Sequence, residues 1–251
     1  MPLILYTSKN IASASIAKKM IEIGATVEPM DTGSDSVLSV PTDFDTDCMI
    51  VLSTHKSKAG NPMLTAHFPG NWDKAEMGGK ERTLNVANGN MLKKIIRELN
   101  IANKKHKLNW PLFIEADHHG PNADVPIIFV EIGSTEKEWR DEKAAMVVAE
   151  AVNNSVRKTQ DSELETVFCI GGGHYSKEFT KMTLERKDIA IGHICPKYAI
   201  DSLAEDTFRQ AIEKNVGTVK RAFVLKESMN SSQKKNVKAL CERFGVDYTE
   251  I

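Results

Sequence analysis

Short, strongly apolar runs alternate along the chain with longer segments in which apolar residues recur every three or four positions. The runs have the length of β-strands, and the longer segments have the periodicity of amphipathic helices. A chain that alternates in this way buries its apolar faces by packing helices on a mostly parallel sheet. We therefore predict an α/β fold, a three-layer sandwich with a mixed, mostly parallel central sheet, in a single domain spanning residues 1–251.

The apolar runs that we interpret as strands cover residues 3–7, 47–53, 112–116, 126–132, 165–170, 188–194, 220–225 and 246–249. We expect them to form one sheet. The run at 47–53 is apolar on both faces, which is typical of a central strand covered by helices. The stretch at about 54–88 is punctuated by glycine and proline and has weak periodicity, so we expect a loop or small insertion there.

Helical periodicity occupies residues 91–103, 135–156, 202–215 and 231–244. Thr135 with Glu138, and Ser202 with Glu205, have the spacing of capping boxes at helix starts. Gly245 is well placed to end the last of these helices.

A further helix is expected near the beginning of the chain. Ser8 stands where an N-cap belongs, and Gly24 lies where the helix would stop. The buried face of this helix is expected to carry Ile11, Ile16, Met20 and Ile21.

Six of the seven histidines lie in glycine- or proline-bearing segments at the ends of predicted strands. These segments are residues 53–60, 64–71, 115–121, 171–175 and 192–198. The loops that follow parallel strands gather at one edge of a sheet, so these histidines can meet in space. The seventh, His106, lies among lysines and is interpreted as solvated surface.

The sharpest motif is Glu115-Ala-Asp-His-His-Gly-Pro121, in which four side chains able to bind a proton or a metal fall within five positions. Neighbouring side chains on a strand point to opposite faces, so His118 and His119 can serve one site only from a turn. Gly120 and Pro121 supply such a turn. The alternative is a polar turn with one histidine bonded to a carboxylate.

Two other segments carry candidate catalytic groups. The glycines before His174 allow close backbone approach to a ligand, and the amides of Gly172 and Gly173 can stabilise an oxyanion. The alternative there is a tight turn after a buried strand. Glu131 lies late in an apolar strand and is a candidate metal ligand or general base, or else a carboxylate paired with lysine or arginine.

Candidate substrate-binding residues are His67 and Asn71, which suit a wall against a ribose or base, and Lys197 and Tyr198, which can contact a phosphate. Pro69-Gly70 explains the turn between the first two without any function. Basic segments at 93–94, 104–107 and 181–187 are further candidates for phosphate contacts, with a solvated helix face as the alternative.

Composition narrows the class of protein. No apolar run approaches the roughly 20 residues that span a bilayer, so we expect no membrane contact. The four cysteines have no redox or zinc-ribbon spacing, which favours reduced thiols in the cytoplasm. No Rossmann or P-loop pattern is present, so no nucleotide cofactor is expected. The net charge of -1 argues against indiscriminate nucleic-acid binding.

Five motifs, in order along nearly the whole chain, resemble those of the archaeal- and plant-type D-aminoacyl-tRNA deacylases. They occupy residues 67–71, 115–121, 131–139, 171–175 and 192–198. The resemblance implies hydrolysis of the ester in D-aminoacyl-tRNA, with Zn²⁺ as cofactor and with broad tolerance of the D-amino acid. This hydrolysis would prevent the toxicity and misincorporation of D-amino acids. It also implies a phosphorylase/hydrolase-like sandwich akin to peptidyl-tRNA hydrolase. The chain departs from the family pattern at Asp117 and Cys195.

On this basis we expect His118, His119 and His174 to bind zinc, with Glu131 or His193 completing or orienting the site. Glu115 or Asp117 would act as general base. We expect a monomer whose partner is D-aminoacyl-tRNA. The alternatives are a zinc-dependent peptidase or nucleoside hydrolase that does not act on tRNA, and a non-catalytic module that binds metal or nucleic acid.

Overall fold

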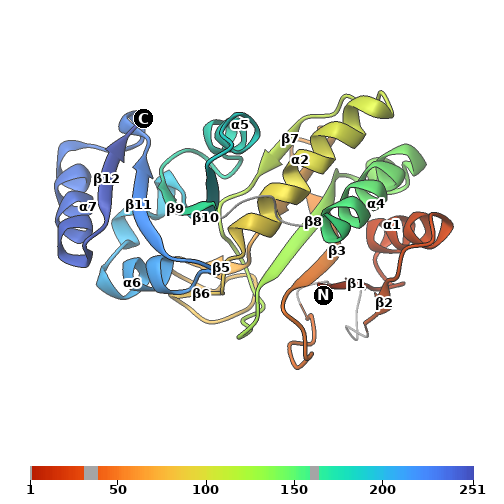
Figure 1. The fold of residues 1–251 in the computed structure, drawn as a ribbon, viewed down its shortest axis with the longest axis horizontal. Coiled ribbons are helices and arrows are strands. Elements are labelled where there is room, and N and C mark those ends of the chain that lie inside the picture. Colours follow the sequence, from red (N-terminus) through yellow and green to blue (C-terminus); the bar gives the residue numbers. More distant parts are fainter. Residues whose placement is uncertain (1, 31–38, 159–163) are drawn as a thin grey trace.

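The computed structural model describes residues 2–30, 39–158 and 164–251 (Figure 1). Six strands form the larger sheet, in the order β2-β1-β3-β8-β4-β7. They are β1 (Leu3–Tyr6), β2 (Glu28–Pro29), β3 (Met49–Lys56), β4 (Met63–His67), β7 (Leu112–Ile114) and β8 (Ile127–Ser134). All neighbours in this sheet are parallel except β4 and β8. The predicted α/β class with a mostly parallel central sheet is confirmed.

A second sheet of four parallel strands has the order β10-β9-β11-β12. Its strands are β9 (Glu165–Ile170), β10 (Ile189–Cys195), β11 (Val219–Val224) and β12 (Asp247–Glu250). The prediction that these strands complete the first sheet is wrong, because within the described residues they form ladders only with one another. The apolar pattern identifies strands but does not specify which strands pair.

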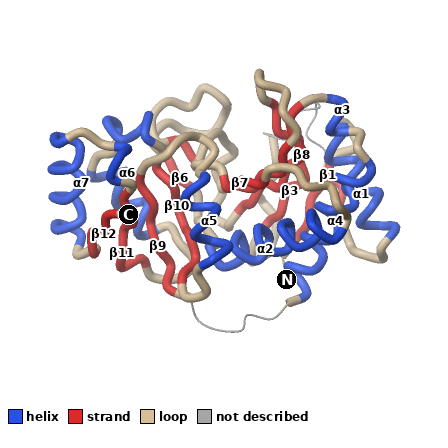
Figure 2. The backbone as a smooth tube through the Cα atoms, turned by 90° about the horizontal axis from the view of Figure 1, so that it is seen from above, coloured by secondary structure: helices blue, strands red, loops and turns tan. Residues whose placement is uncertain are grey.

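Helices α1 (Ile11–Glu22), α2 (Gly89–Lys105) and α4 (Glu142–Arg157) cover one face of the larger sheet (Figure 1). Near the second sheet lie α5 (Lys177–Glu185), α6 (Glu205–Glu213) and α7 (Ser231–Phe244) (Figure 2). Helix α2 packs against β4 and β7 and also against β10. One core cluster contains buried residues of both sheets, so the two sheets share a hydrophobic interior.

The two faces of β3 and β8 have different surroundings. Ile50, Leu52 and Ile128 belong to the cluster beneath the helices. The alternate residues, including Val51 and Phe129, belong to a cluster with Met30 and Val40, which lie outside helices. Among the residues that the structure describes, helices therefore cover the run at 47–53 on one face only. We call the other side of the larger sheet its helix-free face.

The stretch at 54–88 contributes a central strand that the sequence did not reveal. β4 lies between β8 and β7, and all five of its residues are buried. It escaped prediction because threonine and histidine interrupt its short apolar run. The rest of the stretch contains the small ribbon of β5 (Gly70–Asn71) and β6 (Thr83–Leu84).

Several helix ends differ from expectation. Helix α1 is capped by Asn10 rather than Ser8, because the Asn10 side chain accepts a hydrogen bond from the amide of Ser13. Ile21, predicted to be buried, is 60% exposed. Gly245 adopts the left-handed conformation expected of a residue that ends a helix.

The helix predicted at 135–156 is divided in two. α3 (Glu136–Trp139) begins at Thr135, whose amide donates to Glu138 as the capping box predicts. Asp141 then caps α4. The capping box predicted at Ser202 is wrong, because α6 begins after Ala204, whose amide donates to Thr207 Oγ1.

Within the described residues, the helices are too short or too polar to cross a membrane.

Candidate active site

The helix-free face of the larger sheet carries a row of polar side chains from neighbouring strands. Glu131 in β8 lies opposite Ser53 of β3 and Thr65 of β4. Because side chains alternate along a strand, His55 and His67 point to the same face as Glu131. Glu115, directly after β7, continues the same alternation next to His67. The alternation that buries apolar residues at the start of these strands thus places histidines and glutamates at the other end.

The carboxylates of Glu115 and Glu131 lie close to His55. Its Nδ1 is 3.0 Å from Glu115 Oε1 and 3.6 Å from Glu131 Oε2. Its Nε2 lies 2.7 Å from the hydroxyl of Tyr175. Burial alone would lower the pKa of His55, but the contacts with the two carboxylates outweigh it and raise that pKa to about 11.

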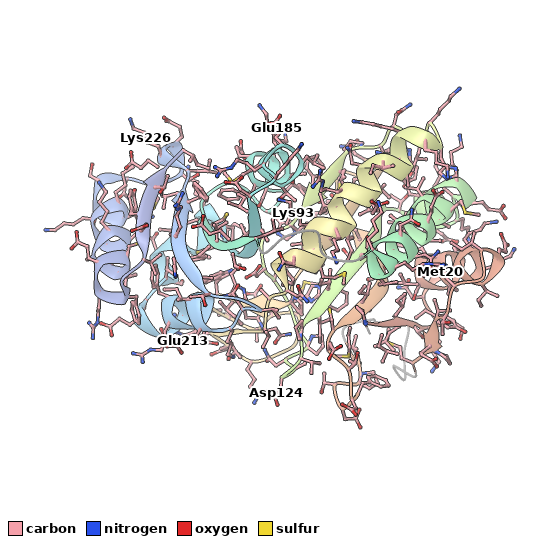
Figure 3. The ribbon with its side chains drawn as sticks, viewed as in Figure 1. Met20, Lys93, Asp124, Glu185, Glu213 and Lys226 are labelled. Carbon is pink, nitrogen blue, oxygen red and sulfur yellow. The ribbon has the colours of Figure 1, made fainter. Side chains whose placement is uncertain are left out.

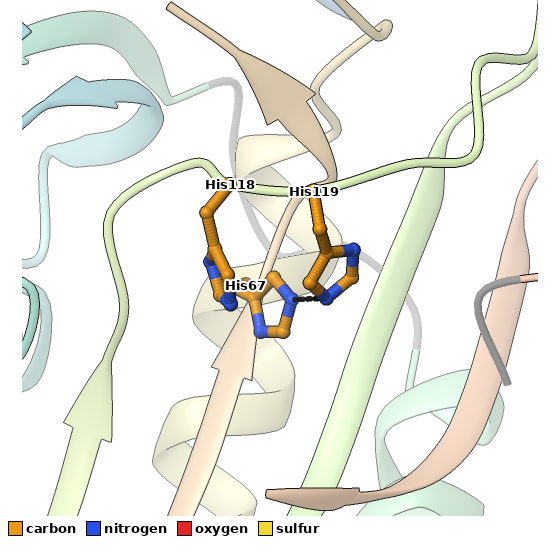
Figure 4. Close-up of side chains that lie close together, drawn as sticks. All are labelled: His67, His118 and His119. Atoms are coloured by element: carbon orange, nitrogen blue, oxygen red, sulfur yellow. Dashed lines mark hydrogen bonds between the residues drawn. The ribbon is translucent and has the colours of Figure 1, made fainter. Parts of the chain in front are cut away.

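Two further histidines reach the cluster from the turn after β7 (Figure 4). His118 Nδ1 lies 2.9 Å from the carbonyl of Ala116, and His119 Nδ1 contacts the carbonyl of Gly120. Because a carbonyl only accepts hydrogen bonds, each Nδ1 carries the proton, and in the neutral ring Nε2 keeps its lone pair. His119 has a φ of 50°, in the left-handed region, which breaks the strand-like alternation of the pair.

Some buried polar atoms in this cluster are left without a hydrogen-bond partner in the described part of the chain. They are His67 Nδ1 and both carboxylate oxygens of Glu115. The His55–Glu115 contact is short enough for an ion pair but is not aligned as a hydrogen bond. Buried polar atoms are ordinarily paired, so these atoms point to a missing proton or cation.

Three overlapping groups of these side chains have ligand atoms within 4.8 Å of one another. The groups are His67, His118 and His119; Glu115, His118 and His174; and His55, Glu115 and Glu131. Imidazole nitrogen and carboxylate oxygen are ordinary zinc ligands. The residues present therefore fit a zinc ion, and the unpaired atoms of Glu115 and His67 lie among them.

Three of the histidines are held in the neutral form that a metal ligand needs. Burial and the neighbouring histidines place the pKa values of His67 and His118 well below the ordinary range. Burial likewise lowers the pKa of His119, to about 4, although its bond to the Gly120 carbonyl opposes the shift.

The second sheet contributes His174 from the loop after β9. His174 Nε2 is 3.8 Å from Glu115 Oε2, and His174 Nδ1 is 3.4 Å from the hydroxyl of Tyr198. Tyr198 is 66% exposed, so it lies at the rim of the cluster rather than within it.

A pocket of about 260 Å³ opens beside His118 and His119. Its wall includes Asn71 and Tyr198, both predicted to contact substrate. The Asn71 amide donates to the carbonyls of Gly78, at 2.9 Å, and Lys80, at 3.2 Å. Asn71 thus holds the loop that forms one side of the pocket.

Four predicted site residues lie differently from expectation. The amide of Gly172 donates to Ser228 Oγ at 2.8 Å, so it is not available to an oxyanion. Gly173 is exposed, and Lys197 is exposed without lining the pocket. His67, predicted to face substrate, is instead fully buried among the other histidines.

Asp117 and His193 form a separate buried pair. His193 Nδ1 lies 2.6 Å from Asp117 Oδ2, and His193 Nε2 lies 2.9 Å from the carbonyl of Lys214. Burial raises the pKa of Asp117, although the His193 ring and the Ile194 amide oppose the shift. With both ring nitrogens occupied, His193 lies outside the groups that could bind metal.

Two residues of the basic segments have partners within the protein. Lys93 is buried near the middle of the molecule, where its Nζ donates to the carbonyls of Arg186 and Ile189 (Figure 3). His106, interpreted as solvated, pairs with Glu150 at 2.7 Å.

The sequence missed two residues of the cluster, His55 and Tyr175. His55 lies in one of the histidine-bearing segments, but the sequence pattern predicts no role for it. The signal that could have identified it is its even spacing from Ser53 and Val51 along one strand face. Tyr175 gives no local signal, since only the fold brings it to His55.

Residues 42–249 match the family model described as D-aminoacyl-tRNA deacylase. Curated relatives with that name include one from Thermococcus kodakarensis, 35% identical over 86% of this chain and 78% of the relative. Another, from Thermococcus onnurineus, is 31% identical over 99% of both chains. The fold also matches the crystal structure of a conserved protein of unknown function. That match has a TM-score of 0.88 and 26% identity, and covers 100% of this chain and 95% of the other.

Proposed function

This chain belongs to the D-aminoacyl-tRNA deacylase family, and on that premise we propose that its buried histidines and glutamates perform the hydrolysis with the help of Zn²⁺. The reaction is hydrolysis of the ester that joins a D-amino acid to the terminal ribose of tRNA. The observation that supports this location is the three groups of donor atoms, in each of which the atoms lie within 4.8 Å of one another. Some of these atoms are buried without a hydrogen-bond partner.

The proposed zinc ligands are His67, His118 and His119, with His174 as a further nitrogen donor beside them. Zinc bound there would lower the pKa of a coordinated water to about 7 and polarise the ester carbonyl. The donor set is larger than the four ligands of one tetrahedral zinc, so the cluster can hold more than one ion.

Glu115 is the better candidate for general base. The carboxylate of Asp117 is already held by His193 and by the amide of Ile194, whereas both oxygens of Glu115 lack a hydrogen-bond partner. Glu115 would accept a proton from water as the water oxygen attacks the ester carbon. The bond from that carbon to the ribose oxygen then breaks, and the proton passes to the departing oxygen.

The pocket beside His118 and His119 is the proposed site of the amino acid and terminal ribose. Its wall combines apolar Trp72 and Met77 with charged Asp73 and Lys74. Such a mixed wall selects no single side-chain chemistry, which supports broad tolerance of the D-amino acid. Tyr198 and Asn71 contribute to the same wall.

In the cell, this reaction would recycle tRNA and prevent misincorporation and toxicity of D-amino acids. We place it in the cytoplasm, where charged tRNA is used. All four cysteines are free and buried, as expected for a reducing compartment. We also propose that the chain acts as a monomer.

The proposal is tested by comparing D-Tyr-tRNA with L-Tyr-tRNA as substrates of the purified protein. Release of D-tyrosine that stops on chelation and returns with Zn²⁺ is the expected result. Equal hydrolysis of both isomers, or full activity in protein shown to be metal-free, would overturn it.

A further inference from the structure

Asp117 and His193 lie where the two sheets meet. Asp117 follows β7 of the larger sheet, directly before His118, and His193 is in β10 of the second sheet. Both side chains are almost completely buried, with exposures of 2% and 0%. Neither belongs to the groups of side chains that could bind metal.

Asp117 forms hydrogen bonds with β10 through both its backbone and its side chain. Its amide donates to the carbonyl of Ile194 at 3.3 Å, and its Oδ1 accepts from the amide of Ile194 at the same distance. Its other oxygen, Oδ2, faces His193 Nδ1 at 2.6 Å. Trp72, in the pocket wall, donates to the same Ile194 carbonyl. The turn that carries His118 is thus tied to the second sheet by three hydrogen bonds from one residue.

His193 in turn is fixed from behind. Its Nε2 faces the Lys214 carbonyl, which follows α6. The pairing of β10 with β9 shifts register between Ile191 and Ile194, so His193 sits in a bulge that can redirect its side chain. Gly192 lets the backbone of β10 approach Asn215 closely, since a Cβ at this position would lie 2.1 Å from Asn215 Oδ1.

We propose that Asp117 and His193 form a latch that positions the turn carrying His118 and His119 against His174 and Tyr198 of the second sheet. Here the latch means these two side chains with the Ile194 amide and the Lys214 carbonyl. The two residues are positioning residues, because they act through the histidines of the cluster. This inference rests on the proposed function for its kinetic readout.

The latch depends on hydrogen-bond geometry, so its chemistry predicts which substitution preserves it. In Asp117→Asn, the amide oxygen can accept from Ile194 and the amide nitrogen can donate to a neutral His193 ring, whose Nε2 then donates to Lys214. Every partner stays satisfied. Asp117→Leu has a similar size and offers no hydrogen bond.

The experiment compares wild type, Asp117→Asn, Asp117→Leu and Lys93→Met at a temperature where all are folded. Lys93→Met is the matched control, since it also removes a buried, hydrogen-bonded charged side chain, and Lys93 is not among the groups that could bind metal. Displacing reacting groups by about 1 Å can cost on the order of 100-fold in rate. We expect Asp117→Leu to lower kcat about 10- to 100-fold with a smaller change in KM.

Asp117→Asn is expected to keep kcat close to wild type. Lys93→Met should lower the melting temperature while preserving kcat. Wild-type kcat in folded Asp117→Leu overturns the latch. The latch is also overturned if Asp117→Asn is as impaired as Asp117→Leu. It is overturned as well if kcat of Lys93→Met falls in proportion to the fall in its melting temperature.

A second measurement separates this inference from the proposed function. The rate at which a chromophoric chelator removes Zn²⁺ from each protein needs no tRNA. Release should be faster from Asp117→Leu than from wild type, Asp117→Asn or Lys93→Met. If wild type binds zinc but does not hydrolyse D-Tyr-tRNA, the proposed function fails, whereas equal release rates overturn the latch.

Discussion

The Nε2 atoms of His67 and His119 lie 3.0 Å apart, and both side chains are buried. Only one of these two nitrogens can carry the proton. Because His119 Nδ1 already donates to the Gly120 carbonyl, a neutral His119 accepts and His67 donates. That leaves a lone pair on His67 Nδ1 facing Glu115 Oε2 at 3.3 Å. A cation among these atoms, displacing the His67–His119 contact, would remove the repulsion.

Removing one histidine of the cluster should abolish turnover without unfolding the chain. In His118→Ala and His174→Ala, activity should fall by more than the roughly 10- to 100-fold that loss of an outer partner of a metal ligand costs. The control is His106→Ala, which loses an ion pair with Glu150 remote from the cluster and should change stability by about 1 kcal/mol or less. Thermal melts and D-Tyr-tRNA hydrolysis measure both effects. Wild-type turnover in both cluster variants would place the site elsewhere.

Elemental analysis should find zinc in protein purified without chelator. His67→Ala should retain less metal than wild type, because it removes one of three nitrogen donors that lie within 4.8 Å. Titration of metal-free protein with Zn²⁺ would count the ions bound. Full metal content in His67→Ala would exclude His67 as a ligand.

The metal-free protein should lose stability as the pH falls from about 6.5 towards 4. The folded pKa of His119 is about 4 against an ordinary 6.5, so in this window the unfolded chain binds a proton that the folded chain does not. For one proton the slope approaches 1.4 kcal/mol per pH unit, about the value of one pKa unit. Comparing wild type with His119→Gln isolates this effect from that of Asp117, whose raised pKa acts in the opposite direction. Identical pH dependence of the two would contradict it.

Binding of tRNA should weaken with salt along a shallow slope, corresponding to roughly two to five phosphate contacts. Lys197→Ala should reduce the slope by about 0.7 if its exposed side chain contacts a phosphate of the single-stranded end. Lys93→Met should leave the slope unchanged, because Lys93 is buried. Affinity measured between low and physiological salt decides this. Binding indifferent to salt would count against a tRNA substrate.

Loosening the pocket loop should affect substrate binding more than chemistry. Asn71→Ala removes two hydrogen bonds to the carbonyls of Gly78 and Lys80, each worth about 0.5–1.5 kcal/mol. We expect KM for D-Tyr-tRNA to rise several-fold, with little change in kcat. A large loss of kcat at unchanged KM would assign Asn71 a different role.

The sequence predicted much of this cluster because its motifs follow strand ends. Glu115, His118 and His119 belong to one motif, His174 and Glu131 belong to two others, and the fold brings them together. Their roles as ligands and base stay predictions. The sequence does not predict His55 and His67 as metal ligands, because their placement depends on which face of β3 and β4 they occupy. That face cannot be assigned while β4 itself is taken for a loop.

The fold class followed from strand–helix alternation, but the division into two sheets did not. Pairing depends on contacts between segments far apart in the chain, such as β4 with β8, and local periodicity does not encode them. Asp117 and His193 illustrate the same limit. The sequence predicts both as reactive groups, yet the junction between the two sheets pairs them with each other and separates them from the histidine cluster.

Helix α2 lies against strands of both sheets, and one apolar core runs beneath it from β1 to β11. Neither sheet can therefore melt without exposing apolar surface of the other. Unfolding one sheet therefore also costs the free energy of exposing the apolar surface of the other. We expect the two sheets to unfold in one cooperative step. A partly unfolded form that keeps the larger sheet alone would retain His67, His118 and His119 without His174, and it would be too rare to contribute to catalysis.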